Sequence, residues 1–271
     1  LRARPYAVAS LEMLKNLLSR TPVIPPLLET RPVKNSALLI VTSDKGLAGA
    51  FNSNVIKKAE VWVKDKKTRG APYTVITVGK KARDYWERQK ELIYENFIGF
   101  GDYTALEDTL PVAKILMDGF LSGAWDEADA VYMNFRTTLL QEAILEKILP
   151  VTGKGIEGAV AGILPERGRF AQPPISNLQP TASYRYEYKF EPSPAEILNE
   201  LVPQLLRMHV HHIILESNAS EHSARMVAMK SASDNARELI GELTLTYNKA
   251  RQAGITRELT EITAGKEALE L

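Results

Sequence analysis

The residues of this sequence that come closest to a recognisable chemical motif are 43–52, Ser-Asp-Lys-Gly-Leu-Ala-Gly-Ala-Phe-Asn. They follow an apolar run and precede a helical pattern, which is where a phosphate-binding loop lies in a dinucleotide-binding fold. However, the spacing of Gly46 and Gly49 matches neither the dinucleotide-binding fingerprint nor the P-loop. Gly79-Lys80-Lys81, after the next apolar run, supplies no acidic residue for a ribose. The sequence therefore favours a tight turn in which Gly46 and Gly49 allow close helix–strand packing.

The histidines are the second candidate for chemistry, because His209, His211 and His212 lie close together in a helical pattern. Positions i, i+2 and i+3 do not share one face of a helix, and the usual metal-binding pair in a helix is i, i+4. The pattern therefore favours a solvated helix face over a metal site. No Ser/His/Asp or paired-carboxylate spacing stands out elsewhere, so we expect no catalytic group, no cofactor and no metal.

Charge and composition limit the classes of function. The net charge is +1, so no bulk attraction to nucleic acid or acidic lipid is expected. The basic run Lys57–Arg69 also contains Glu60 and Asp65, which favours a solvated helix face over a nucleic-acid patch. The absence of Cys excludes disulfides and thiolate metal sites. No run of about 18 apolar residues predicts a membrane span, and we expect no signal peptide at the start, Leu1.

The elements that must position these residues alternate between strand and helix in the middle of the chain. Ser36–Thr42 is a continuous apolar run, which is typical of a strand buried on both faces. The alternation predicts an α/β domain with a Rossmann-like, mostly parallel sheet and helices on both sides. The predicted strands are Ser36–Thr42, Tyr73–Val78, Leu92–Phe100 and Ala130–Thr138, and the predicted helices are Asn54–Lys66, Ala82–Arg88 and Thr104–Leu121.

The chain leaves this domain through a segment rich in Gly and Pro. Residues 151–183 are predicted to form a long loop, and Tyr184–Phe190 alternates in the manner of an edge strand. Ser193 is a good N-cap and Pro194 suits the first turn of a helix. A helix is therefore predicted to begin here.

That helix is the longest feature of the sequence, because its pattern continues to Leu271. At 1.5 Å per residue it would be about 115 Å long, whereas a compact domain is about 30 Å across. Most of it must therefore find a partner outside its own domain. Residues spaced alternately by four and three give it a coiled-coil seam rich in small side chains: His222, Met226, Met229, Ser233, Ala236, Ile240, Leu243, Tyr247, Ala250 and Gly254. Because such a seam buries little area, two helices that pack along it would be weakly held together.

At the other end, Arg4–Ser19 also has helical spacing of apolar residues, and Pro22, Pro25 and Pro26 then form a linker. The predicted organisation is a short N-terminal helix (residues 1–21), an α/β domain (22–192) and a long C-terminal helix (193–271).

Two stretches carry a resemblance to a known family. The turn Thr42–Asn54 (TSDKGLAGAFNSN) and the tail Ala219–Gly265 (ASEHSARMVAMK…TRELTEITAG) resemble the γ subunit of the F-type ATP synthase. The resemblance implies that the N- and C-terminal helices form an antiparallel coiled coil inside a hexamer of α and β subunits. It also implies that the α/β domain sits on a ring of c subunits beside the ε subunit, without a catalytic group. The family's N-terminal helix begins several turns earlier, and the loop Gly153–Ser183 lacks the Cys pair of the chloroplast form.

The resemblance also implies the contact residues. Arg225, Arg251, Gln252 and Thr256 match positions that meet loops of the β subunits, and Tyr188 and Glu191 match positions that meet the c ring. The stretch Leu243–Arg257 contains Lys249, Arg251 and Arg257 but no acid, which suits acidic loops; ordinary solvated charges are the alternative. The location implied is the cytoplasmic side of a bacterial plasma membrane, as a peripheral protein without a span.

Two other functions remain open from the residues alone. A nucleotide-binding α/β enzyme with a coiled-coil dimerisation tail would bind nucleotide as an isolated chain. A structural coiled-coil scaffold would form a stable homodimer. The γ subunit would do neither, and would instead be recovered with its partner subunits.

Overall fold

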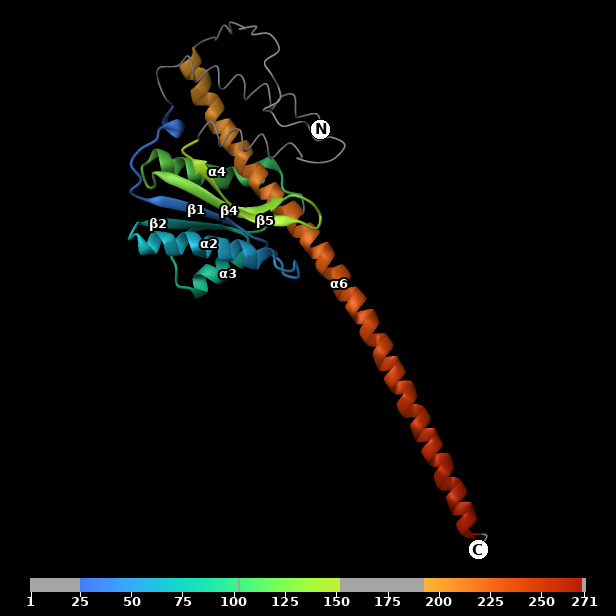
Figure 1. The fold of residues 1–271 in the computed structure, drawn as a ribbon. Helices are drawn as coiled ribbons and strands as arrows, with labels where there is room; N and C mark the ends of the chain where they lie inside the picture. Colours follow the sequence, from blue (N-terminus) through green and yellow to red (C-terminus); the bar gives the residue numbers. More distant parts are fainter. Residues whose placement is uncertain (1–24, 102, 152–192, 270–271) are drawn as a thin grey trace, which may run out of the picture. The chain divides into compact units, whose positions relative to one another are not determined.

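A five-stranded sheet forms the centre of the α/β domain (Figure 1). The computed structural model describes residues 25–101, 103–151 and 193–269. The strand order is β3-β2-β1-β4-β5, in which β1 to β4 are parallel and β5 is antiparallel to β4. The strands are β1 (Ser36–Val41), β2 (Tyr73–Val78), β3 (Ile93–Phe97), β4 (Glu127–Phe135) and β5 (Gln141–Leu149). The mostly parallel sheet confirms the predicted fold class.

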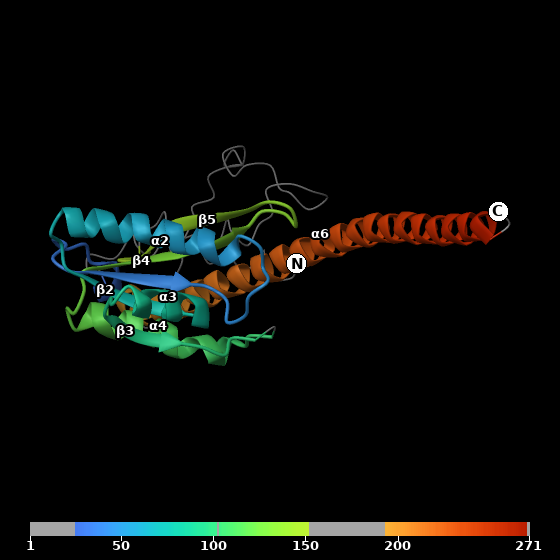
Figure 2. The same ribbon diagram turned by 90° about the horizontal axis from the view of Figure 1, so that it is seen from below.

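Helices cover both faces of the sheet, with α2 and α3 on one side and α4 on the other (Figures 1 and 2). A short 3-10 turn, η1 (Pro26–Leu28), precedes β1. The helices are α2 (Phe51–Thr68), α3 (Lys80–Arg88), α4 (Leu106–Leu121) and α6 (Pro194–Leu269). The four strands and three helices predicted between residues 36 and 138 are therefore present, with ends displaced by a few residues.

The alternation of side chains along β1 separates two apolar cores. Every residue of β1 is buried, as predicted for a strand covered on both faces. Leu39 and Val41 lie in the core shared with α4 and α6, whereas Leu38 and Ile40 lie in the core shared with α2 and α3. Strand β1 therefore packs against α6 through one face, and the loop of residues 43–52 follows the end of the same strand.

The fifth strand was missing from the sequence prediction, which assigned no element to residues 139–149. β5 pairs with β4 through a short hairpin in which the Arg136 and Thr137 amides donate to the Leu140 carbonyl. Charged residues interrupt the apolar positions of β5, and much of the strand is exposed or half-buried. An exposed edge strand has little apolar periodicity, so pairing with β4 rather than local pattern decides its structure.

The basic run of α2 is solvated, as predicted, except at Lys66. Most of its lysines are exposed. Lys66 instead lies beside the buried Glu127, with 2.8 Å between Nζ and Oε1, and Ser36 donates to the same carboxylate at 2.9 Å. Lys147 also pairs with Glu127. Although burial opposes ionisation, these partners lower the Glu127 pKa from 4.5 to about 2.

Helix α6 is continuous over 76 residues. Ser193 caps it as predicted, because its hydroxyl accepts from the Glu196 amide at 3.3 Å and donates to the Glu196 carboxylate at 3.1 Å. Residues up to 224 belong to one compact unit and those from 225 onward to another. The predicted N-terminal helix, its coiled coil with α6, the loop 153–183 and the strand Tyr184–Phe190 lie outside the described residues, and the division at residues 21 and 192 stays a prediction.

Candidate functional site

The loop between β1 and α2 is fastened by its own side chains. The Asp44 carboxylate accepts hydrogen bonds from the Lys80 amide and the Gly99 amide, both at 2.8 Å. The Ser43 amide donates to the Asn52 side chain at 3.0 Å. Because Lys80 is the first residue of α3, the protein's own carboxylate occupies the helix terminus where an external anion would bind. This arrangement favours the predicted structural turn over a phosphate site.

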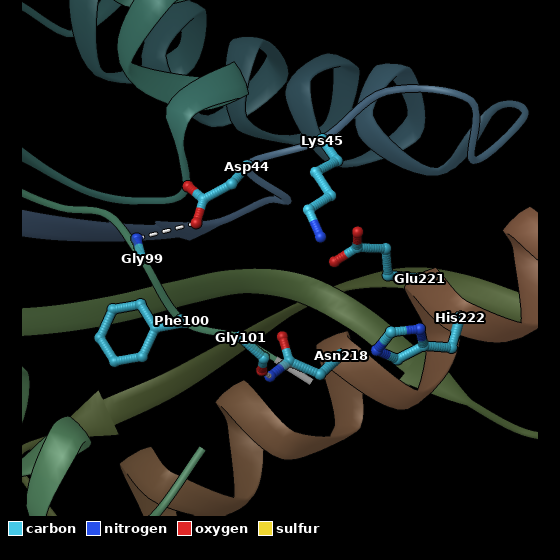
Figure 3. Close-up of a pocket in the computed structure, with 8 residues that line it drawn as sticks. All are labelled: Asp44, Lys45, Gly99, Phe100, Gly101, Asn218, Glu221 and His222. Atoms are coloured by element: carbon cyan, nitrogen blue, oxygen red, sulfur yellow. Dashed lines mark hydrogen bonds between the residues drawn. The ribbon is translucent and has the colours of Figure 1, made fainter. Parts of the chain in front are cut away.

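A cavity of about 210 Å³ opens beside this loop (Figure 3). Its wall is formed by the loop after β1, the segment after β3 and α6, and Lys45 and Glu221 point toward one another across it. The lining residues are Asp44, Lys45, Gly99, Phe100, Gly101, Asn218, Glu221 and His222. The side chains that line the pocket carry both charge signs, and Phe100 is the one large apolar side chain among them, whereas a cofactor site is usually lined mostly by hydrophobic and aromatic side chains.

The two glycines of the loop differ in what they require. Gly49 has a φ of +54°, in the left-handed region, which glycine adopts more readily than other residues; this backbone conformation explains why a glycine is found at this position. A Cβ on Gly46 would meet no atom within 4 Å. The prediction that Gly46 allows close packing is therefore wrong. Leu47, between them, also has a positive φ of +64° and is 78% exposed.

We expect Gly49→Val to destabilise the α/β domain by about 1–3 kcal/mol, because a β-branched residue at positive φ is strained. Urea unfolding of the full chain measures the change. The matched control is Gly46→Ala, which should shift stability by less than about 0.5 kcal/mol. Equal stability of Gly49→Val and the parent chain would show that the left-handed turn is not required.

The three clustered histidines are not on a solvated face, so that expectation is wrong. His209 and His212 are half-buried, and desolvation lowers the pKa of both. The His209 Nε2 atom lies 3.5 Å from a Glu146 carboxylate oxygen, and the His211 ring lies 3.2 Å from the Thr109 hydroxyl. They face the α/β domain, which the spacing could not reveal. Among the residues that the structure describes, no group of His, Cys, Asp and Glu is arranged to hold a metal ion.

The first part of α6 is held on the domain by an apolar stripe and a set of polar contacts. Leu198, Val202, Leu206 and Val210 are buried in the core under α4. Further along, buried serines bond to the β4–β5 hairpin: the Ser220 hydroxyl donates to the Met133 carbonyl at 3.2 Å, and the Ser223 hydroxyl donates to the Thr138 carbonyl at 2.9 Å. The Asn218 amide donates to the Thr104 hydroxyl at 3.0 Å. Sequence analysis missed these serines, because small polar residues carry no local signal of a docked helix.

The second unit, residues 225–269, is a helical segment with an exposed seam. The large apolar residues of the predicted seam are all exposed, and Tyr247 reaches 67%. The other large apolar residues of the seam, all exposed, are Met226, Met229, Ile240 and Leu243. A soluble protein rarely leaves such a stripe uncovered, so the helix is built for a partner surface.

The cations expected at partner contacts lie on this second unit. Arg251, Gln252 and Thr256 are exposed. Neither Lys249 nor Arg251 has an ion-pair partner among the described residues, whereas Arg257 pairs with Glu261 at 2.9 Å on the same helix. Arg225 is half-buried at the start of the unit. Their contacts with β subunits stay predictions, and Tyr188 and Glu191 lie outside the described residues.

Between residues 25 and 269, leaving out 102 and 152–192, no helix is both long and apolar enough to cross a bilayer.

The sequence comparisons define the class of protein. The family model described as ATP synthase matches residues 1–269. A curated relative named ATP synthase gamma chain, from Dehalococcoides mccartyi, is 40% identical over 99% of this chain and 86% of its own length. A second relative of the same name, from Roseiflexus castenholzii, is 38% identical over the same shares of the two chains.

Solved structures share the fold. A chain of the Euglena gracilis mitochondrial ATP synthase (OSCP/F1/c-ring) matches with a TM-score of 0.60 and 18% identity, over 99% of this chain and 88% of its own. A chain of the Tetrahymena thermophila mitochondrial ATP synthase (central stalk/c-ring) gives 0.55 and 18%, over 86% of this chain and 95% of its own. The present chain belongs to the ATP synthase gamma chain family. It is thus a non-catalytic subunit of the ATP synthase, which confirms the resemblance and sets aside the enzyme and scaffold alternatives.

Proposed function

We propose that this chain is the rotor shaft that couples proton flow through a membrane ring to conformational cycling of the catalytic β subunits. Family membership indicates that the chain is part of an ATP synthase complex. One structural observation supports the role of rotor within it. A single helix, α6, is buried in the α/β domain along its first part and exposed along the rest. A helix that packs on its own domain along one part and is exposed along another can be contacted there by other subunits, which supports the proposal.

The exposed part of α6 suits contact with surrounding subunits that must not bind it too tightly, because a rotor has to turn inside them. Its seam alternates large apolar residues such as Tyr247 with small ones such as Ser233, Ala236 and Gly254. Small residues allow close approach but bury little area. We infer that the N-terminal residues 1–21 cover part of this seam as an antiparallel coiled coil, and that the α and β subunits surround both helices.

The charged residues of the second unit are assigned to the β subunits. Arg251 offers a planar guanidinium fork suited to a carboxylate, and no ion pair within the described chain competes for it. Arg225, Gln252 and Thr256 complete this proposed contact set. A rotor drives its partners only if its contacts differ in free energy among their states, because a ligand shifts an equilibrium by its differential affinity alone.

The α/β domain is assigned to the membrane end of the complex. We propose contacts with the c ring through Tyr188 and Glu191, and a neighbouring ε subunit. We place the chain as a peripheral membrane protein on the cytoplasmic side of a bacterial plasma membrane, a location supported by the bacterial relatives. Neither nucleic acid nor a bound cofactor has a place in this function.

We expect the isolated chain to show no ATPase activity above buffer, because the described residues contain no catalytic set. The chain should instead co-assemble with purified α and β subunits, measured by size-exclusion chromatography and by ATP turnover of the complex. A parallel sample of α and β without the chain is the control. Turnover by the chain after removal of all α and β subunits, or a stable homodimer that excludes them, contradicts the rotor assignment.

A further inference from the structure

The layer formed by α2 and α3 carries most of the positive charge of the α/β domain. Residues 51–90, which contain both helices, include eleven Lys and Arg but four Asp and Glu. Residues 91–149, which contain α4, include three Lys and Arg but eleven Asp and Glu. Because α2 and α3 cover one face of the sheet and α4 covers the other, the domain has a basic side and an acidic side (Figures 1 and 2). The net charge of +1 for the whole chain conceals this asymmetry.

The acidic side chains of α2 and α3 are already engaged within the layer. The ion pairs are Asp65–Arg69 at 2.8 Å, Asp84–Arg83 at 2.7 Å and Glu87–Arg83 at 3.8 Å, and Glu60 accepts a hydrogen bond from the Tyr85 hydroxyl. These contacts leave an excess of cations on the outer surface of the two helices.

The excess cations form what we call the basic face. Its residues share two properties: their side chains are exposed, and they make no ion pair with a residue that the structure describes. They are Lys57, Lys58, Lys64, Lys80, Arg88 and Lys90. An exposed cation without an acidic neighbour keeps its full attraction for an external anion, subject to screening by salt.

An apolar side chain lies within the basic face. Lys57, Val61 and Lys64 are spaced by four and three residues, so they share one side of α2. The buried residues Val55 and Trp62 mark the opposite side of the helix. Val61 is 66% exposed, so this side of α2 presents an apolar group between two cations. That combination suits the boundary between head groups and acyl chains of a lipid layer.

We propose that the basic face of α2 and α3 docks on the surface of an anionic lipid bilayer. Five of its six residues are lysines, which act as mobile point charges, whereas arginine supplies the planar fork suited to a fixed carboxylate. Lipid head groups move laterally and can match such scattered charges, which favours a bilayer over an acidic protein surface. The acidic α4 side is repelled by the same bilayer, so the domain binds in one orientation.

The use of this surface rests on the proposed function, which assigns the α/β domain to the membrane end of the complex. The attraction itself is a property of the chain alone. It therefore makes the domain a second point of membrane contact, separate from the proposed contacts with the c ring.

The test is co-sedimentation of the full chain with phosphatidylcholine vesicles that contain or lack phosphatidylglycerol. The parent chain should bind the anionic vesicles more tightly than the neutral ones, and raising the salt concentration from about 0.05 M to about 0.5 M should release it. The double variant Lys57→Glu/Lys64→Glu should bind the anionic vesicles about ten-fold or more weakly. Because both side chains are exposed and unpaired within the described chain, its melting temperature should equal that of the parent. Lys57→Gln/Lys64→Gln, which adds no negative charge, should lose about three-fold or more and serves if the first variant folds poorly.

The matched control is Lys114→Glu/Lys230→Glu, which changes the net charge equally but alters exposed lysines of α4 and of the second unit. It should stay within about two-fold of the parent, because screening confines the attraction to charges near the bilayer. Equal binding of the parent to both kinds of vesicle, or equal losses in the two glutamate variants, overturns the lipid-docking proposal. So does a parent chain that ignores both vesicles while Lys57→Glu/Lys64→Glu fails to co-assemble with α and β subunits, since the basic face would then contact an acidic protein. Loss of vesicle binding alone leaves the rotor assignment intact, because co-assembly is measured separately.

Discussion

Replacing Gly119 with alanine should destabilise the α/β domain by about 3 kcal/mol or more. A Cβ at this position of α4 would lie 1.9 Å from a ring atom of Trp125. The indole cannot easily move, because Trp125 is 1% exposed, its Nε1 donates to the Leu116 carbonyl at 3.2 Å, and Tyr94 packs edge-on at 5.6 Å between ring centroids. Relief of the clash therefore disrupts the core, the hydrogen bond or the helix.

Urea unfolding of the full chain measures this loss. The matched control is Gly241→Ala, since Gly241 is also inside a helix but a Cβ there would meet no atom within 4 Å. This control should gain about 0.5–1 kcal/mol of helix stability, because alanine loses less backbone entropy than glycine. A Gly119→Ala chain within about 1 kcal/mol of the parent would mean that Trp125 repacks at little cost.

The parts of the fold that could be predicted are those whose local pattern agrees with their tertiary role. The run Ser36–Thr42 is apolar because both faces of β1 are covered. Helix α6 begins where Ser193 and Pro194 predict it, because a side-chain cap is a local interaction. The strand–helix alternation then leaves few topologies for a parallel sheet, and the observed one is among them.

The parts that could not be predicted depend on contacts between distant residues. Strand β5 is defined by pairing with β4 and has a weak pattern of its own. The environment of His209 comes from Glu146, which is remote in sequence. The sequence predicts a structural turn at residues 43–52, but it does not show that the Asp44 carboxylate holds this turn by accepting from the Lys80 and Gly99 amides. In each case the residue type was visible in the sequence, but the partner that decides its role was not.

The candidate contact residues show a different limit. The resemblance implies that Arg251, Gln252 and Thr256 contact β subunits, and the structure adds that they are exposed. Exposure is required for a partner contact but is also the ordinary state of a polar helix residue. Their role is therefore decided by function in the assembled complex rather than by the geometry of this chain.

Replacing both Arg251 and Gln252 with alanine should lower proton-driven ATP synthesis by roughly ten-fold without unfolding the subunit. A charge-assisted hydrogen bond from the Arg251 guanidinium to an acidic loop is worth about 1.5–3 kcal/mol when partly desolvated, and about 1.4 kcal/mol corresponds to a factor of ten. Both side chains are exposed and belong to the second unit, so their removal leaves the α/β cores unchanged. ATP synthesis in reconstituted vesicles and thermal melting of the subunit measure the two effects.

The matched control is Arg237→Ala, which removes an exposed arginine from the same unit that already faces Asp234 at 3.7 Å. Because Arg237 is satisfied on its own helix, its loss should change synthesis by less than about two-fold, as expected for an exposed ion pair. A double variant that synthesises ATP at the parent rate would exclude Arg251 and Gln252 from the coupling step. The charges of this stretch would then contribute nothing measurable to the difference in contact free energy among the β-subunit states. The shaft would have to act through its shape and its seam of small residues.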